Sequence, residues 1–147
     1  SGTAAVLNEA WLEVTTATTT TAPNVDLVSY TSADGSTGVG GGNVSFPAAA
    51  TDLHSMIQLP LNASEQGIRS AETLDINTAS AAGAVNLIII RPLARIPLLA
   101  NVWNEVSFLD DTMGLPRIYD NACLGLALLA TVTTAVSVWG QVNCAYG

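Results

Sequence analysis

Hydrophobic and polar residues alternate with a period of two along most of this chain, as they do in β-strands that bury one face. The clearest case is the charge-free stretch Asn121–Gly147, which splits into two alternating halves around a β-branched turn at 131–135. In its first half, one face carries Leu124, Leu126 and Leu128. The pattern predicts a C-terminal β-hairpin.

A hairpin centred between Thr133 and Thr134 would place Cys123 directly opposite Cys144, so the two cysteines are predicted to be a cross-strand pair. They match no metal-ligand spacing, and a chain of 147 residues can build a core without a covalent staple. We therefore expect reduced, buried thiols, and a disulfide is the alternative.

Similar alternation predicts further strands, and almost no segment has the period of a helix. In Leu87–Ile90 both faces are apolar, which is typical of a strand buried on both sides, and the stretch 62–71 is interpreted as a connection. The fold class predicted is all-β, an antiparallel β-sandwich or jelly-roll-like barrel, in one domain over 1–147 with 1–23 as an extended N-terminal arm. The other strands are expected at 10–16, 25–31, 43–47, 73–78, 85–92 and 98–109, with one more around 52–54.

Charged residues make up only 11% of the chain, against about 25% in typical domains, and lysine is absent. So few charges predict a surface that is largely covered in an assembly, with a homo-oligomer as the expected state. The net charge of −8 argues against nucleic acid, whose phosphates require a basic face. A transmembrane helix over 122–140 is the competing interpretation, but threonines within that run and the lack of basic flanks argue against a membrane protein.

Candidate chemistry is sparse. Asp52, His54 and Ser55 lie too close together in one short segment to resemble a catalytic triad, and we expect Asp52 and His54 to share a surface hydrogen bond on one strand face. The glycine-rich stretch 32–43 lacks the strand, helix and lysine of phosphate-binding loops, so it is predicted to be a mobile surface or interface loop. We expect no catalytic residue, no cofactor and no metal site.

The stretch 114–122, Gly-Leu-Pro-Arg-Ile-Tyr-Asp-Asn-Ala, is followed by a Leu/Ala strand, a Thr/Ala turn and a final strand with Trp139-Gly140. This pattern covers about the final quarter of the chain and resembles the tail of small virion structural proteins of tailed bacteriophages. The resemblance implies a non-enzymatic capsid decoration or cement protein, often trimeric, that binds the major capsid protein on the virion surface. It transfers no site residue.

Aromatic residues and arginine are enriched at the centres of protein interfaces, so they are the candidate contact residues. For the two tryptophans among them, an ordinary core position is an equal alternative. A receptor- or carbohydrate-binding module of a phage head fibre or tail is the second hypothesis, and a fimbrial subunit ranks below it. The interface candidates are Trp11, Tyr30, Trp103, Arg117 and Tyr119.

Overall fold

The structure is a computed structural model that describes residues 6–17, 23–46, 54–77, 82–99, 102–104 and 123–128. The chain divides into two compact units, Ser1–Leu115 and Pro116–Gly147. Six residues of the second unit are described, so the single domain predicted over the whole chain stays a prediction.

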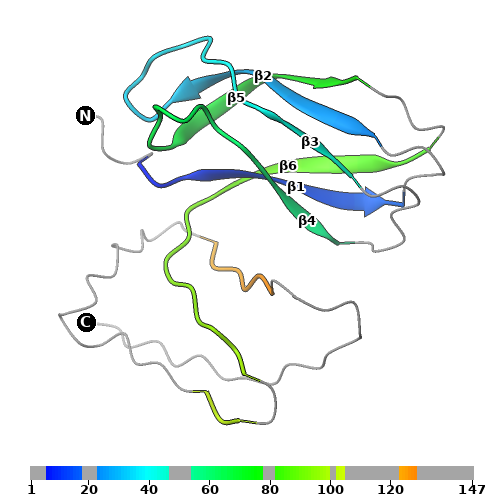
Figure 1. The fold of residues 1–147 in the computed structure, drawn as a ribbon, viewed down its shortest axis with the longest axis vertical. Helices are drawn as coiled ribbons and strands as arrows, with labels where there is room; N and C mark the ends of the chain where they lie inside the picture. The colour runs from blue at the N-terminus through cyan, green and yellow to red at the C-terminus, as the bar shows by residue number, and fades with distance from the viewer. Residues whose placement is uncertain are drawn as a thin grey trace. The chain divides into compact units, whose positions relative to one another are not determined.

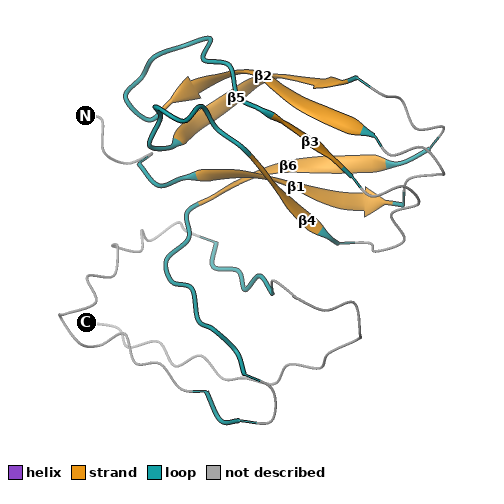
Figure 2. Ribbon diagram, viewed as in Figure 1, coloured by secondary structure: helices purple, strands orange, loops and turns teal. Residues whose placement is uncertain are grey.

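The first unit is all-β: its described residues form two three-stranded antiparallel sheets and contain no helix (Figures 1 and 2). One sheet has the strand order β4-β1-β6 and the other β3-β2-β5. Glu9–Thr16, within the range expected as an N-terminal arm, is the central strand β1, so this part of the range belongs to the folded core. The strands are β1 Glu9–Thr16, β2 Asn24–Ser32, β3 Asn43–Ser45, β4 Met56–Leu59, β5 Ile68–Ile76 and β6 Ala84–Ile90.

The two sheets share one hydrophobic core, which the inward-facing residues of the alternating strands supply. On β1, the side chains of Ala10, Leu12 and Val14 are fully buried, and Val25 and Leu27 meet them from β2. Tyr30, Phe46, Leu59 and Ile68 complete the buried cluster. The period-two pattern places Val25 and Leu27 on one face of β2, as observed, but it places Tyr30 on the other; register shifts around Ser29 bring Tyr30 into the same core.

Strand expectations differ from the structure at three places. The strand expected around 52–54 is observed later in the chain, as β4 at Met56–Leu59. Residues 68–71, expected in a connection, are the first part of β5, where Ile68 is paired with Ser32 and fully buried. The strand predicted over 98–109 is absent at its described positions, 98–99 and 102–104. Pro97 precedes this range and has no backbone N–H for a sheet ladder, which explains why the chain does not resume pairing there.

The expectation that β6 is buried on both faces is wrong. Ile89 is 37% exposed, and no residue of β6 is fully buried. β6 lies at the edge of its sheet and pairs only with β1 among the described residues, so one of its sides has no neighbouring strand to cover it. An apolar run identified a strand here, but not its place in the sheet.

The glycine-rich stretch is tied to β2 by backbone hydrogen bonds, contrary to the predicted mobile loop. Tyr30 and Val39 exchange both backbone bonds at 2.9 and 3.0 Å. The N–H of Gly41 donates to the carbonyl oxygen of Leu27 at 2.9 Å. The N–H of Leu27 in turn donates to the carbonyl oxygen of Gly42 at 3.1 Å. The glycines allow this loop to approach β2 closely.

Gly41→Ala should lower the free energy of unfolding by about 1–3 kcal/mol, because overpacking a tight site forces its neighbours to move. A Cβ at Gly41 would lie 2.9 Å from Cδ2 of Leu27, which is fully buried. The matched control is Gly40→Ala, where the nearest atom is the carbonyl oxygen of Val28 at 3.8 Å and stability should stay within about 0.5 kcal/mol. Urea denaturation measures both; equal effects of the two substitutions would contradict the close approach.

Candidate interaction surface

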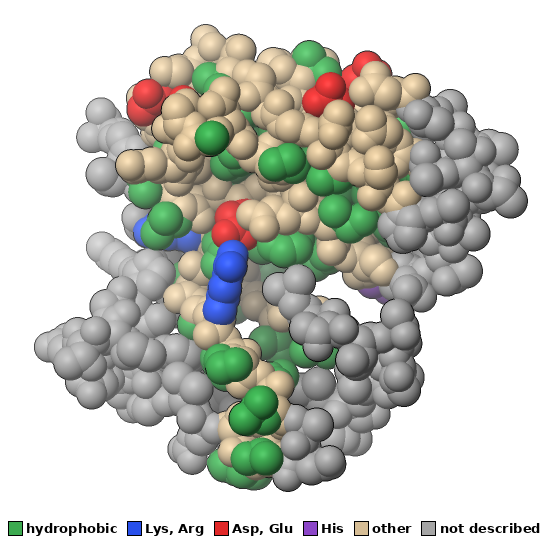
Figure 3. All heavy atoms as spheres, in the orientation of Figure 1, with side chains coloured by type: hydrophobic (Ala, Val, Ile, Leu, Met, Phe, Trp, Pro, Cys, Tyr) green, Lys and Arg blue, Asp and Glu red, His purple; other side chains and the backbone are tan. Residues whose placement is uncertain are grey.

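Large hydrophobic side chains are exposed along the chain that follows β6. We call residues 96–103 the apolar segment; its described residues are 96–99, 102 and 103. Trp103 is 87% exposed, and hydrophobic side chains run along this stretch in Figure 3. Contiguous exposed apolar residues mark sites of interaction more often than scattered ones do. The other exposed members are Ile96, Leu98, Leu99 and Val102, at 41%, 49%, 66% and 60%.

The side chain of Asn104 is hydrogen-bonded to the backbone of the apolar segment. Its Nδ2 donates to the backbone carbonyls of Leu99 and Val102, at 3.1 and 2.9 Å, and its Oδ1 accepts from the N–H of Leu99 at 3.4 Å. Asparagine side chains commonly replace a missing backbone partner in this way. These bonds hold Asn104 to the backbone that precedes Trp103, so less conformational freedom would be lost when the indole binds a partner.

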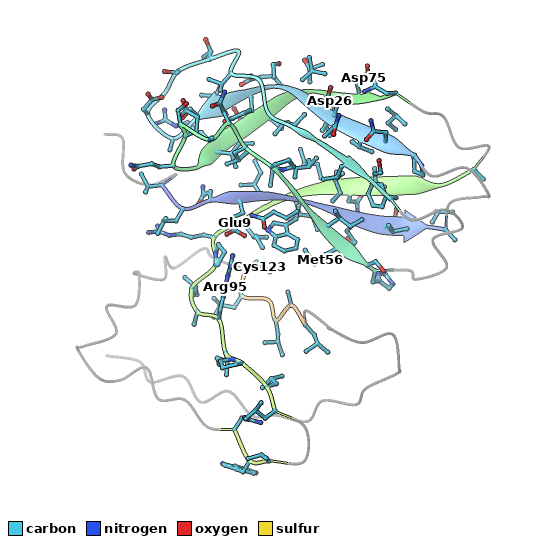
Figure 4. All side chains as sticks on the ribbon, in the orientation of Figure 1. Glu9, Asp26, Met56, Asp75, Arg95 and Cys123 are labelled. Atoms are coloured by element: carbon cyan, nitrogen blue, oxygen red, sulfur yellow. The ribbon has the colours of Figure 1, made fainter. Side chains whose placement is uncertain are left out.

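Arg95 ties the start of the apolar segment to β1. Its Nη2 donates to Oε1 of Glu9 at 2.8 Å, while Oε2 of Glu9 accepts from the indole Nε1 of Trp11 at 3.0 Å. Glu9 and Arg95 point toward each other in Figure 4. The Arg95 side chain is 69% exposed, so the ion pair contributes at most about 1 kcal/mol to stability. Its main effect is to position the chain beside the sheet.

The aromatic candidates divide between core and surface. Tyr30 is fully buried and its hydroxyl accepts from the N–H of Asn62 at 3.1 Å, so its proposed surface contact is wrong. Burial raises the pKa of this phenol, against the lowering effect of the Asn62 bond. Trp11 is only 8% exposed, so it occupies a buried position, which was the alternative for the tryptophans. Trp103 is a surface residue. Arg117 and Tyr119 lie outside the described residues.

His54 lies in a turn with φ of 68°, not on the predicted strand. Its Nδ1 is 2.9 Å from Oε1 of Glu13, so its surface partner comes from β1; Asp52 lies outside the described residues. The side chain of His54 is 77% exposed. A histidine and one carboxylate at the surface form no catalytic arrangement by themselves.

Three further observations concern an acidic pair, metal binding and membrane spans. Asp26 and Asp75 are direct cross-strand partners on β2 and β5, both labelled in Figure 4, and like charges in such a pair oppose strand pairing. Within the described ranges, no three His, Cys, Asp or Glu side chains are grouped to hold a metal ion. A search of the same ranges finds no helix long and apolar enough to cross a membrane.

A groove of about 520 Å³ lies beside the Glu9–Arg95 pair. Its walls come from the start of β1, the 61–67 loop and residues 92–95, and include the carboxylates of Glu9 and Glu65. These carboxylates make internal contacts, Glu9 as above and Glu65 with the hydroxyl of Ser32. The groove therefore separates the 61–67 loop from the chain that leads into the apolar segment, and its charged groups already have partners.

Cys123 is exposed, which differs from the buried thiol expected there. The stretch Cys123–Leu128 forms no strand, so the predicted C-terminal hairpin is not confirmed. Cys144 lies outside the described residues, and the cross-strand pair stays a prediction.

Comparison with protein-family models, curated proteins and solved structures finds no match to this chain. The functional argument therefore rests on the residues themselves. Trp103 was identified from its residue type alone, but the roles of Arg95 and Asn104 were missed. The available signal was the pair Pro92 and Pro97, which exclude the leucines around them from a regular sheet ladder.

Proposed function

We propose that this chain is a non-enzymatic virion structural protein of a tailed bacteriophage, a decoration or cement protein that binds across subunits of the major capsid protein. The observation that carries the proposal is the exposed apolar segment, with Trp103 at 87% exposure, on a chain in which only 11% of residues are charged. Such a surface suits binding through area and shape, with one aromatic anchor among its exposed residues.

The remaining parts of the proposal concern architecture and assembly. The two antiparallel sheets with a common core suit a β-sandwich or a jelly-roll-like barrel, completed by a C-terminal hairpin. A homotrimer on the capsid surface would repeat the apolar segment three times, and that repetition would raise the affinity for a symmetric lattice without any new type of contact. A protein with this task would stabilise the head by adding buried area between subunits.

Trp103→Ala should weaken binding to preformed capsids by roughly tenfold or more, because truncating an aromatic anchor at an interface costs about 2 kcal/mol. Co-sedimentation of the purified chain with capsids assembled without it measures the affinity. The control is Val28→Ala, which removes an exposed side chain, 46% accessible, from β2. It should bind like the unchanged protein.

Failure of the unchanged chain to sediment with capsids, or equal affinity of the Trp103 and Val28 variants, would overturn the proposal.

The second candidate function, a carbohydrate- or receptor-binding module, is favoured by the same exposed indole, since aromatic rings serve as binding platforms in β-sandwich scaffolds. Saturable binding on a glycan array that is lost in Trp103→Ala, together with no capsid binding, would support this candidate.

A further inference from the structure

The core that the described residues of the first unit form is left open on one side. In an antiparallel ladder, directly opposite residues share a face, so Leu74 and Ile76 of β5 face inward with their buried partners Leu27 and Val25. Leu74 and Ile76 are nevertheless 36% and 53% exposed. These two inward-facing side chains have no covering strand among the described residues.

The same holds on the other sheet. Val85, Leu87 and Ile89 of β6 lie opposite the buried Val14, Leu12 and Ala10 of β1, and therefore also face inward. Ile89 is 37% exposed, and Val85 and Leu87 are only partly buried. We call these five residues, Leu74 and Ile76 on β5 and Val85, Leu87 and Ile89 on β6, the open row.

The strand orders explain why this side is open. β3 and β4, each the outer strand of its sheet, lie next to each other, and the N–H of Gly42 donates to the carbonyl of Pro60 at 2.9 Å where the two strands approach. This contact closes one side of the core. The opposite outer strands are β5 and β6, and the open row lies along them.

The two strands on the open side differ in their protection against a further strand. The exposed residues of β5 include Arg69, Glu72 and Asp75, and charged side chains on an edge discourage pairing. β6 has the sequence Ala-Val-Asn-Leu-Ile-Ile-Ile, without charge or proline. Within the described part of the chain, its backbone pairs with β1 alone. β6 therefore presents an unprotected apolar edge.

A segment of matching chemistry lies in the second unit. Leu124, Leu126 and Leu128 alternate along a charge-free stretch and are 54%, 87% and 50% exposed. Their spacing of two residues equals that of Val85, Leu87 and Ile89, so one pleated strand could place the three leucines in line with that row. No charge would have to be desolvated on either side. Residues 123–128 form no strand in the single chain, and we call them the leucine strand because they would become one on pairing.

We propose that the leucine strand of a second copy of this chain adds to the free edge of β6 and covers the open row. Its backbone N–H and C=O groups would pair with the unpaired side of β6, and its three leucines would face Leu74, Ile76 and the inward row of β6. The three leucines and the open row are both exposed in the single chain. Exchange between copies would cover the open row of one copy with the leucines of another. Because each copy has one donor and one acceptor, the contact is head-to-tail and can close into a ring.

The experiment measures native mass by light scattering for the full chain and two variants, without capsids. Leu126→Asp removes the donor, and Ile89→Lys puts a charge on the acceptor edge. The unchanged chain should have a mass of two or more copies, and each variant alone should have the mass of one. An equimolar mixture of the two variants should recover a two-copy species, because one variant retains the donor and the other the acceptor.

The control is Leu7→Asp, since Leu7 is 62% exposed and belongs to neither strand. It should associate like the unchanged chain. A single-copy mass for the unchanged chain, an unaltered mass for Leu126→Asp, or no two-copy species in the mixture would overturn the proposal. If the unchanged chain has the mass of one copy and Leu126→Asp has a lower melting temperature, the leucine strand packs within its own chain.

A competition experiment covers the case in which Ile89→Lys fails to fold by circular dichroism. A synthetic peptide of residues 121–130, made soluble by an added lysine tail, should reduce the mass of the unchanged chain to one copy plus one peptide. A peptide in which Leu126 is aspartate should have no effect. Strand addition would be contradicted if both peptides reduced the mass equally, or if neither peptide reduced it. Capsid binding plays no part in these measurements, so they can fail while the proposed function holds.

Discussion

Trp11→Ala should lower the free energy of unfolding by about 3–5 kcal/mol, the range found when buried aromatic residues are truncated. Trp11 lies in the middle of the central strand β1, opposite Gln58 of β4 and Ile88 of β6, and is 8% exposed. Its removal would leave a cavity and would also free the Glu9 oxygen that accepts from the indole. The melting temperature should fall by several degrees in a thermal scan followed by circular dichroism.

The matched control is Trp103→Ala, which makes the same chemical change at a side chain that is 87% exposed. Its stability should stay within about 0.5 kcal/mol of the unchanged chain. The two variants should thus have opposite phenotypes: at a temperature where both are folded, Trp11→Ala should keep its affinity for capsids, and Trp103→Ala should bind them roughly tenfold or more weakly. A stable Trp11→Ala that no longer binds would assign Trp11 to the contact surface.

Leu12→Ala should cost about 2–5 kcal/mol, because the deleted methyl groups leave a void that the surrounding strands can fill only in part. Leu12 is fully buried between Ile57 of β4 and Leu87 of β6, and lies in the core that both sheets share. The midpoint of urea denaturation should move to lower concentration with little change in slope.

Leu99→Ala is the control for this substitution, since Leu99 is 66% exposed in the apolar segment. Its unfolding midpoint should not change measurably. A comparable loss of stability in both variants would mean that the apolar segment packs as core, and would count against its use as a contact surface.

The strands at 10–16 and 25–31 could be predicted closely because apolar and polar residues alternate along them, and the strand at 85–92 because of its continuous aliphatic run. β5 was predicted too short, since 68–72 contains Arg69, Ser70 and Glu72 and resembles a surface loop. Its pairing with β2 decided the matter, and that pairing is interrupted by several register shifts which no local pattern reveals.

The candidate surface could be predicted only in part. Trp103 was a candidate by residue type, but Trp11 and Tyr30 satisfied the same criterion and are buried. Asn104 and Arg95 act through hydrogen bonds to residues that are five and 86 positions away in the chain. Sequence alone gives no measure of which of these groups meet.

The sequence by itself determined the all-β class and placed Leu12 and Val14 together on one face of β1, since side chains alternate between the two faces of any strand. Only the tertiary structure decided which strands lie at the edges. It placed β6 at an edge with its aliphatic residues partly exposed, and it buried Trp11 while leaving Trp103 in solvent. The physical reason is that burial depends on which other strands cover a face, and those strands come from distant parts of the chain.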